Sequence, residues 1–293
     1  MKIAVTGSSG WLARSLFFSI ENLNLQGFDL DVNFYSRESK KVQLADGRTI
    51  LTKPIEQIRD SHFDLYIPLA FLTREKYSSL GEKVYEDENR RIIQNDAYIC
   101  ETLEEPKVLL ISSGVVKHPS ALQIANPSFM SYAKLKKQQE EVFKSIIRTE
   151  NLNVCYLYSC TSRDMTNLGY AFSSIVMKAL NNEQIHINSY KKVLRKYVDL
   201  RQLFEVMIRS IASGNQFTIS SGGELIEIQD LANLIVSELD SKSIISRSEI
   251  DIGHDDVYFS KDNSMESLFS ENKMNVIGIR DQIRNVSSAL RSN

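Results

Sequence analysis

The sequence contains few cysteines, and none of them are closely paired. Only 3 cysteines occur among the 293 residues, at Cys100, Cys155 and Cys160, and no two of them form a Cys-x-x-Cys pair. An odd, small set of this kind encodes neither a disulfide framework nor a structural zinc site. We therefore expect a protein of a reducing compartment whose core is held together without covalent links.

Charge of one sign is not in excess. The chain has 35 Lys and Arg against 37 Asp and Glu, a formal net charge of −2. A protein that binds nucleic acid regardless of sequence normally carries a basic surplus. This balance argues against a nucleic-acid partner.

Long hydrophobic runs are also missing. No run approaches the roughly 18 apolar residues of a membrane span, and the chain starts with the strand-like Lys2-Ile3-Ala4-Val5 instead of an apolar leader. We expect a cytoplasmic protein that makes no use of a membrane.

Histidine is too sparse to suggest a metal centre. The 4 histidines are His62, His118, His186 and His254. No two of them stand at the spacing of metal ligands, so we expect no metal.

Short, continuously apolar runs separated by segments of helical period dominate the first half of the chain. Such runs, without polar alternation, are typical of parallel strands covered on both faces. They are Ile3–Val5, Val32–Tyr35, Leu65–Ala70, Val108–Ile111 and Val154–Tyr158. The pattern predicts an α/β fold, a Rossmann-type, doubly wound parallel sheet followed by a smaller mixed α/β C-terminal substrate domain.

We place the dinucleotide-binding domain at 1–158 and the mostly substrate-binding domain at 159–293, with a segment near 190–215 returning to the first domain. The expected helices are Trp11–Asn22, Gly81–Glu101, Ser131–Thr149, Gly169–Asn182, Tyr197–Gly214 and Ile226–Leu239.

A glycine turn follows the first strand. The residues Thr6-Gly7-Ser8-Ser9-Gly10-Trp11-Leu12-Ala13 stand between that strand and the first helix. In such a turn the first glycine adopts backbone angles that other residues avoid, and the second lets the chain approach a pyrophosphate. The amides that open the helix then face the anion. Because strand, turn and helix occur in this order, we favour nucleotide binding over a plain structural turn. Trp11 by itself reads as a core residue that anchors the helix.

A serine hydroxyl, a tyrosine phenol and a lysine ammonium stand near a later strand and the long helix that follows it. Ser113 follows the Val108–Ile111 run, and Tyr132 and Lys136 stand four residues apart on the next long helix. Residues at this spacing project from one helix face. An ammonium beside a phenol favours the phenolate and so lowers the phenol pKa. The three side chains therefore predict a site of proton transfer at the carboxyl ends of the strands.

Together these motifs resemble those of the extended short-chain dehydrogenases, the NAD(P)-dependent epimerase/dehydratase family that acts largely on nucleotide sugars. The resemblance implies that Ser113, Tyr132 and Lys136 are catalytic, that Asn89 is the structural asparagine of its helix, and that Ser113 and Arg195 bind the substrate. It implies a cofactor contact set of Thr6, Gly7, Ser9, Gly10, Trp11, Leu12, Ser36, Arg37, Leu69, Ala70, Tyr132 and Lys136.

The end of the second strand bears on cofactor choice. An NAD-preferring fold places a carboxylate there to bond the ribose hydroxyls, whereas this chain has Ser36-Arg37. A hydroxyl and a planar cation suit a 2′-phosphate. We therefore expect NADP(H), with NAD(H) as the alternative.

The leading functional hypothesis is an NADPH-dependent ketoreductase that acts on a nucleotide-linked sugar. Three alternatives stay open: a nucleotide-sugar 4-epimerase with tightly bound NAD, a reductase of a small non-sugar ketone, and a non-catalytic dinucleotide-binding sensor. Dehydration is disfavoured, because the Asp-Glu pair that the family's dehydratases usually carry after the catalytic hydroxyl residue is replaced by Gly114 and Val115. The paired long helices also suggest a homodimer.

Overall fold

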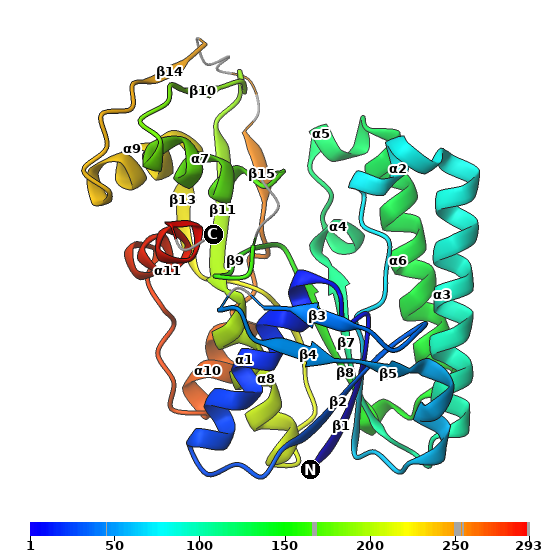
Figure 1. Ribbon diagram of the computed structural model, residues 1–293. Coiled ribbons are helices and arrows are strands. Elements are labelled where there is room, and N and C mark those ends of the chain that lie inside the picture. The colour runs from blue at the N-terminus through cyan, green and yellow to red at the C-terminus, as the bar shows by residue number, and fades with distance from the viewer. Residues whose placement is uncertain (45, 166–168, 249–252, 254, 292–293) are drawn as a thin grey trace.

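The computed structural model describes residues 1–44, 46–165, 169–248, 253 and 255–291. These residues form two lobes, a larger one around a parallel sheet and a smaller one beside it (Figure 1).

The larger lobe contains a seven-stranded parallel sheet. In spatial order its strands are β12 (Thr218–Ser220), β8 (Leu152–Leu157), β7 (Lys107–Ser113), β6 (Leu65–Pro68), β1 (Lys2–Thr6), β2 (Asp31–Ser36) and β5 (Lys53–Pro54). The chain extends the sheet from β1 in one direction through β2 and β5, and in the other through β6, β7 and β8. In open α/β sheets the crevice at such a reversal is where ligands bind.

Helices cover both faces of this sheet. The helices α1 (Trp11–Leu25) and α8 (Leu200–Ala212) pack on one face, and α3 (Glu82–Thr102) and α6 (Pro127–Ile146) on the other. Within β1, Ile3 and Val5 belong to the first core and Ala4 to the second. Because successive strand residues point to opposite faces, a strand buried on both sides must be apolar throughout. The predicted doubly wound parallel sheet is confirmed.

The smaller lobe is built around β11 (Val193–Asp199). Strand β13 (Glu224–Glu227) pairs with it antiparallel, while β15 (Asp256–Tyr258) and β9 (Ser159–Thr161) pair with it in parallel at its first and last residues respectively. A third core joins this sheet to α7 (Ala171–Leu180), α9 (Ile228–Glu238) and α11 (Ile279–Arg291).

The other described elements are shorter. They are the hairpin β3 (Lys41–Gln43) and β4 (Thr49–Leu51), the parallel pair β10 (Ile185–Ile187) and β14 (Ile245–Arg247), the 3₁₀ helices η1 (Ile55–Asp60) and η2 (Thr149–Asn151), and the helices α2 (Glu75–Leu80), α4 (Gly114–Lys117), α5 (Ala121–Ile124) and α10 (Ser264–Glu271). Within the described ranges, no helix is long and apolar enough to cross a membrane.

Predicted helix starts were wrong at four helices. The helices expected from Gly169 and Ile226 begin at Ala171 and Ile228, and Ile226 itself lies in β13. Helix α6 begins at Pro127, one turn before Ser131, because the Asn126 side chain accepts a hydrogen bond from the Ser128 amide and proline suits the first helical position. Residues 197–199 are the end of β11 instead of a helix. The helix α8 starts after Asp199, whose carboxylate accepts from the Gln202 amide at 3.0 Å.

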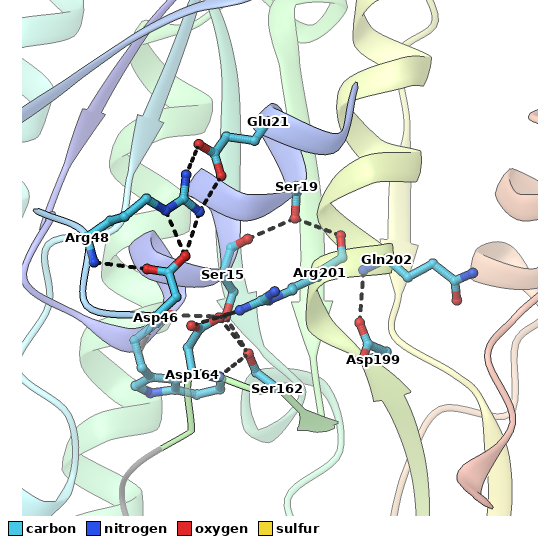
Figure 2. Close-up of polar contacts among 11 residues, drawn as sticks. Ser15, Ser19, Glu21, Asp46, Arg48, Ser162, Asp164, Asp199, Arg201 and Gln202 are labelled. Atoms are coloured by element: carbon cyan, nitrogen blue, oxygen red, sulfur yellow. Dashed lines mark hydrogen bonds and ion pairs between the residues drawn. The ribbon is translucent and has the colours of Figure 1, made fainter. Parts of the chain in front are cut away.

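A buried polar cluster joins α1, α8 and the segment after β9 (Figure 2). Asp164, which follows β9 and is 0% exposed, accepts three hydrogen bonds from the Arg201 guanidinium of α8, two from Nη2 at 2.9 and 3.0 Å and one from Nε at 3.0 Å. It also accepts from Ser15 of α1 and from Ser162, both at 3.1 Å. One carboxylate therefore fixes α1 against α8 and the segment after β9.

Candidate active site

The turn after β1 has the backbone that its sequence predicts. Gly7 has φ +72°, and a Cβ on it would lie 2.3 Å from the amide nitrogen of Ala70. The Gly10 amide donates to the Gly7 carbonyl at 3.0 Å, and helix α1 starts at the next residue. Only glycine satisfies both demands at position 7. The first amides of α1 thus open toward the carboxyl ends of β1 and β6.

The predicted cofactor residues of this turn differ in exposure. Ser9 and Gly10 are exposed, and Trp11 and Leu12 are half-buried and line a cavity. The Thr6 side chain is buried instead, with its hydroxyl 3.2 Å from the Tyr66 hydroxyl and 3.3 Å from Asp96 Oδ1. Thr6 therefore offers a ligand its backbone only.

The segment after β6 is held from α3. Asn89, which is buried, accepts from the Leu72 amide at 2.8 Å and donates to the Leu72 carbonyl at 3.3 Å. This contact fixes Leu69 and Ala70 against the glycine turn and sets the place of Phe71.

The predicted catalytic residues come together in a cavity of about 370 Å³. Ser113 reaches it from the end of β7, and Tyr132 and Lys136 reach it from α6. Trp11 from the glycine turn and Arg195 from β11 line the same cavity. The larger lobe and the smaller lobe thus both contribute walls.

The environment of Tyr132 differs from the sequence-based expectation. Burial raises the pKa of the phenol above its usual value, the Tyr258 phenol raises it further, and a hydrogen bond with Ser113 partly offsets the rise. We predicted a lowered pKa from the neighbouring lysine. Desolvation dominates instead, because the charged phenolate loses more by leaving water than the neutral phenol does. Tyr132 is therefore protonated in this state and poised to donate.

Lys136 is buried, and its ammonium already donates two hydrogen bonds within the protein. It donates to the Ile111 carbonyl at 3.1 Å and to Gln139 Oε1 at 3.0 Å, and lies 4.1 Å from the centroid of the Phe71 ring. An ammonium has three donors, so one remains for a ligand beside the π face of Phe71. Burial lowers the pKa of Lys136 to about 8, while the carboxylates of Asp96 and Glu140 act to raise it.

Those two carboxyl groups form a polar layer beneath the cavity. Burial raises the pKa of Asp96 to about 7, although the Tyr66 hydroxyl donates to it at 2.5 Å. Glu140 accepts hydrogen bonds from Ser112 and from the Tyr156 hydroxyl. The Ser112 hydroxyl is thereby held toward α6, which leaves Ser113 as the hydroxyl presented to the reacting groups.

Arg195 is oriented by the neighbouring strand. Its Nη2 donates to Asp256 Oδ2 at 2.5 Å, and its Nη1 donates to the carbonyls of Leu194 and Asp256. Guanidinium has five N–H donors in a fixed fork, so this pairing sets its direction and leaves donors for an anionic ligand.

Tyr158 and Tyr258 are among the aromatic residues of the cavity that the sequence reasoning missed. The Tyr258 hydroxyl lies 3.4 Å from Ser113 Oγ, and the ring centroids of Tyr158 and Tyr258 are 5.0 Å apart. Tyr158 also covers Gly114, where an added Cβ would lie 2.2 Å from its ring. Only the pairing of β15 with β11 places Tyr258 here, and no local pattern signals it.

The residues expected to choose the cofactor stand at the end of β2 and are not among those that line the cavity. The Arg37 side chain is 73% exposed and pairs with Glu88 at 3.3 Å. The Ser36 hydroxyl donates to the Glu38 carbonyl at 2.6 Å and lies 2.6 Å from the Thr52 hydroxyl. Arg37 can therefore turn to a ligand, whereas Ser36 is engaged within the chain.

The part of the chain that the structure describes holds no group of three or more metal-ligating side chains. His254 lies outside the described residues.

Comparison with solved structures shows which proteins share this fold. Over 99% of its length the chain matches the UDP-glucose 4-epimerase of Thermus thermophilus in complex with NAD, with 99% of that chain covered, 14% identity and a TM-score of 0.70. It matches the UDP-N-acetylglucosamine 4-epimerase of Bacillus cereus at 14% identity and 0.70, covering 99% and 96% of the two chains. For the dTDP-glucose 4,6-dehydratase of Streptomyces venezuelae, a double mutant with NAD bound, the identity is 14%, the TM-score 0.73 and the coverage 100% and 98%.

No family model matches the chain, and no curated protein matches it in sequence. The likeness is therefore one of fold: along its whole length the chain has the architecture of the two 4-epimerases and the 4,6-dehydratase named above.

The residues of the crevice fit a nicotinamide dinucleotide. The bare glycine backbone before α1 suits the pyrophosphate, and Lys136 keeps one donor toward the cavity. The Phe71 ring lies against the Lys136 ammonium, with the ring centroid 4.1 Å from Nζ. A ribose hydroxyl would share the ammonium with this ring or displace it.

Proposed function

We propose that the chain is an NADPH-dependent ketoreductase that acts on a nucleotide-linked sugar. The observation that carries this proposal is the gathering of Ser113, Tyr132 and Lys136 in one cavity with residues of the glycine turn and with Arg195. A binding module without turnover would need none of the three, and such a sensor is the proposal's alternative from another class.

The proposal assigns a role to each side chain. When bound, the cofactor would supply the hydride. Tyr132 donates its proton to the substrate oxygen, since its phenol is protonated in this state. Ser113 holds that oxygen in reach of the phenol, and Lys136 would hold the cofactor ribose. Arg195, fixed by Asp256, binds the diphosphate of the nucleotide.

Two features argue against dehydration as the reaction. The positions that follow Ser113 are Gly114 and Val115, which cannot act as acid or base. The Tyr158 ring leaves no room for a side chain at position 114, since a Cβ there would lie 2.2 Å from it. Reduction of a ketone needs only the phenol and the hydride.

A ligand panel tests the substrate class. We expect the melting temperature to rise with at least one of UDP, dTDP, GDP and CMP, because binding to the folded state alone stabilises it. Mass spectrometry of nucleotide hexoses incubated with protein and NADPH should show reduction, a gain of two mass units. A protein that ignores all four nucleotides would be a reductase of a non-sugar ketone or no enzyme of this kind. Loss of 18 mass units would point to a dehydratase.

A titration tests the cofactor. We expect NADPH to bind more tightly than NADH, and Arg37→Ala to weaken NADPH binding about tenfold (~1.4 kcal/mol) with little effect on NADH. Arg91→Ala is a matched control, because Arg91 pairs with the same Glu88 carboxylate but lies on α3. Tighter binding of NADH by about tenfold would remove the role of Arg37 and make a 4-epimerase with retained NAD the preferred function.

A homodimer through α3 and α6 also belongs to the proposal. Their outer faces carry exposed Val84, Tyr98 and Met130, which a second copy would cover. The chain has a mass of 33.4 kDa, and light scattering at micromolar concentration is expected to give twice that mass. A monomer in that range would contradict the dimer.

A further inference from the structure

Tyr258 stands at the reacting centre without a role in the mechanism above. It is the last residue of β15 in the smaller lobe, and its hydroxyl lies 3.4 Å from Ser113 Oγ at the end of β7 in the larger lobe. It lines the cavity with Ser113, Tyr132 and Arg195. The contact joins residues 145 positions apart in the sequence.

The strand that carries Tyr258 also fixes Arg195. In the parallel ladder Tyr258 is the partner of Arg195, and Asp256 is the partner of Val193. Asp256 pairs with the guanidinium at 2.5 Å, and that guanidinium lies 5.7 Å from the centroid of the Tyr258 ring. One short strand thus presents a carboxylate to the anion-binding residue and a phenol to the serine.

The chemistry of the pair gives the hydrogen bond a direction. A phenol is more acidic than an aliphatic hydroxyl, so Tyr258 is the better donor and Ser113 Oγ the acceptor. With that lone pair occupied, the Ser113 proton is directed away from Tyr258, to the side of the Tyr132 phenol with which Ser113 also hydrogen-bonds and where the substrate oxygen would lie. Burial raises the pKa of Tyr258, so its phenol keeps the proton that it donates to Ser113. A separation of 3.4 Å is long for two hydroxyls, and such contacts often tighten only when substrate is bound.

We propose that Tyr258 is a positioning residue that acts through Ser113: its phenol donates to Ser113 Oγ, fixes the direction of the serine proton, and so orients the reacting oxygen of the substrate. This rests on the proposed function, and it adds a residue of the smaller lobe to the catalytic centre.

A double-mutant cycle tests the link without any substrate. Ser113→Ala, Tyr258→Phe and the double variant are compared by melting temperature. We expect the double variant to lose less than the sum of the single losses, because either change alone already breaks the hydrogen bond. Tyr158→Phe removes a hydroxyl from the adjacent ring and leaves the Ser113–Tyr258 pair in place, so its loss should add to that of Ser113→Ala. Additive losses for Tyr258→Phe would overturn the proposal.

A kinetic cycle tests the positioning role with the nucleotide sugar that the panel identifies. Tyr258→Phe should lower kcat about tenfold with KM nearly unchanged, because a serine proton without fixed direction orients the oxygen less well. In the Ser113→Ala background the same change should lower kcat no further. An equal fall in both backgrounds, or a change in KM alone, would contradict action through Ser113. If the wild-type chain turned over no nucleotide sugar, the proposed function would fail, and the melting cycle would still decide whether the link exists.

Discussion

Replacing Tyr132 with phenylalanine is expected to abolish most turnover while cofactor binding persists. The change deletes the proton that the substrate oxygen receives and keeps the ring that packs edge-on against Phe71, with centroids 5.6 Å apart. General acid catalysis of this kind contributes about 10²–10⁴-fold, so kcat should fall by about that factor. The measurement is the initial rate of NADPH oxidation with the identified nucleotide sugar, alongside a titration of NADPH affinity. Near-normal turnover would rule out the phenol as the acid.

The same mechanism predicts how the rate depends on pH. Burial lowers the pKa of Lys136 to about 8, so the ammonium is lost as the pH rises through that value. The parameter kcat/KM reports the free enzyme, and for reduction it should fall above about pH 8. Lys136→Met should remove this limb of the profile. Lys134→Met should retain it, since Lys134 lies on the same helix with 64% of its side chain exposed.

The second large effect concerns stability. Asp164→Asn is expected to lower the free energy of unfolding by about 3–5 kcal/mol, because removing one partner of a buried ion pair leaves the other charge uncompensated. The Arg201 guanidinium is only 19% exposed, and its shortest contact with Asp164 is 2.9 Å. The loss is measurable by urea denaturation.

The ion pair of Glu21 and Arg48 in Figure 2 offers a matched control for this variant. Glu21, also on α1, pairs with Arg48 at 2.6 Å, but the two side chains are 36% and 50% exposed. Exposed pairs contribute about 0–1 kcal/mol, so Glu21→Gln should cost no more than that. Equal losses for Asp164→Asn and Glu21→Gln would mean that burial does not govern the strength of these pairs.

The sequence by itself determined the larger lobe and its glycine turn. Strands that are apolar at every residue, such as Ile3–Val5, must be covered on both faces, which leaves few architectures other than a doubly wound sheet. The need for glycine at position 7 is predictable for a similarly local reason, because the turn itself requires a positive φ there, +72° in the structure. The spacing of Tyr132 and Lys136 placed both on one helix face, and the structure places both in one cavity.

The start of α6 and the end of β11 were harder to predict from the sequence. Helix and strand ends depend on capping contacts such as those that Asn126 and Asp199 make. Neighbouring residues in the sequence are equally plausible caps, so the sequence alone does not fix the end. Tyr197 and Val198 suit a strand or a helix, and only pairing with β9 and β13 decided for the strand.

Only the tertiary structure decided what surrounds the catalytic side chains. The pairing of β15 with β11 brought Tyr258 to Ser113 across 145 residues, a contact that no local pattern encodes. Burial raised the pKa of Tyr132 where the adjacent lysine alone predicted a fall. Desolvation depends on everything packed around a group, and that packing exists only once both lobes are folded. The residue types of the site are therefore a property of the sequence, and their protonation and direction are properties of the fold.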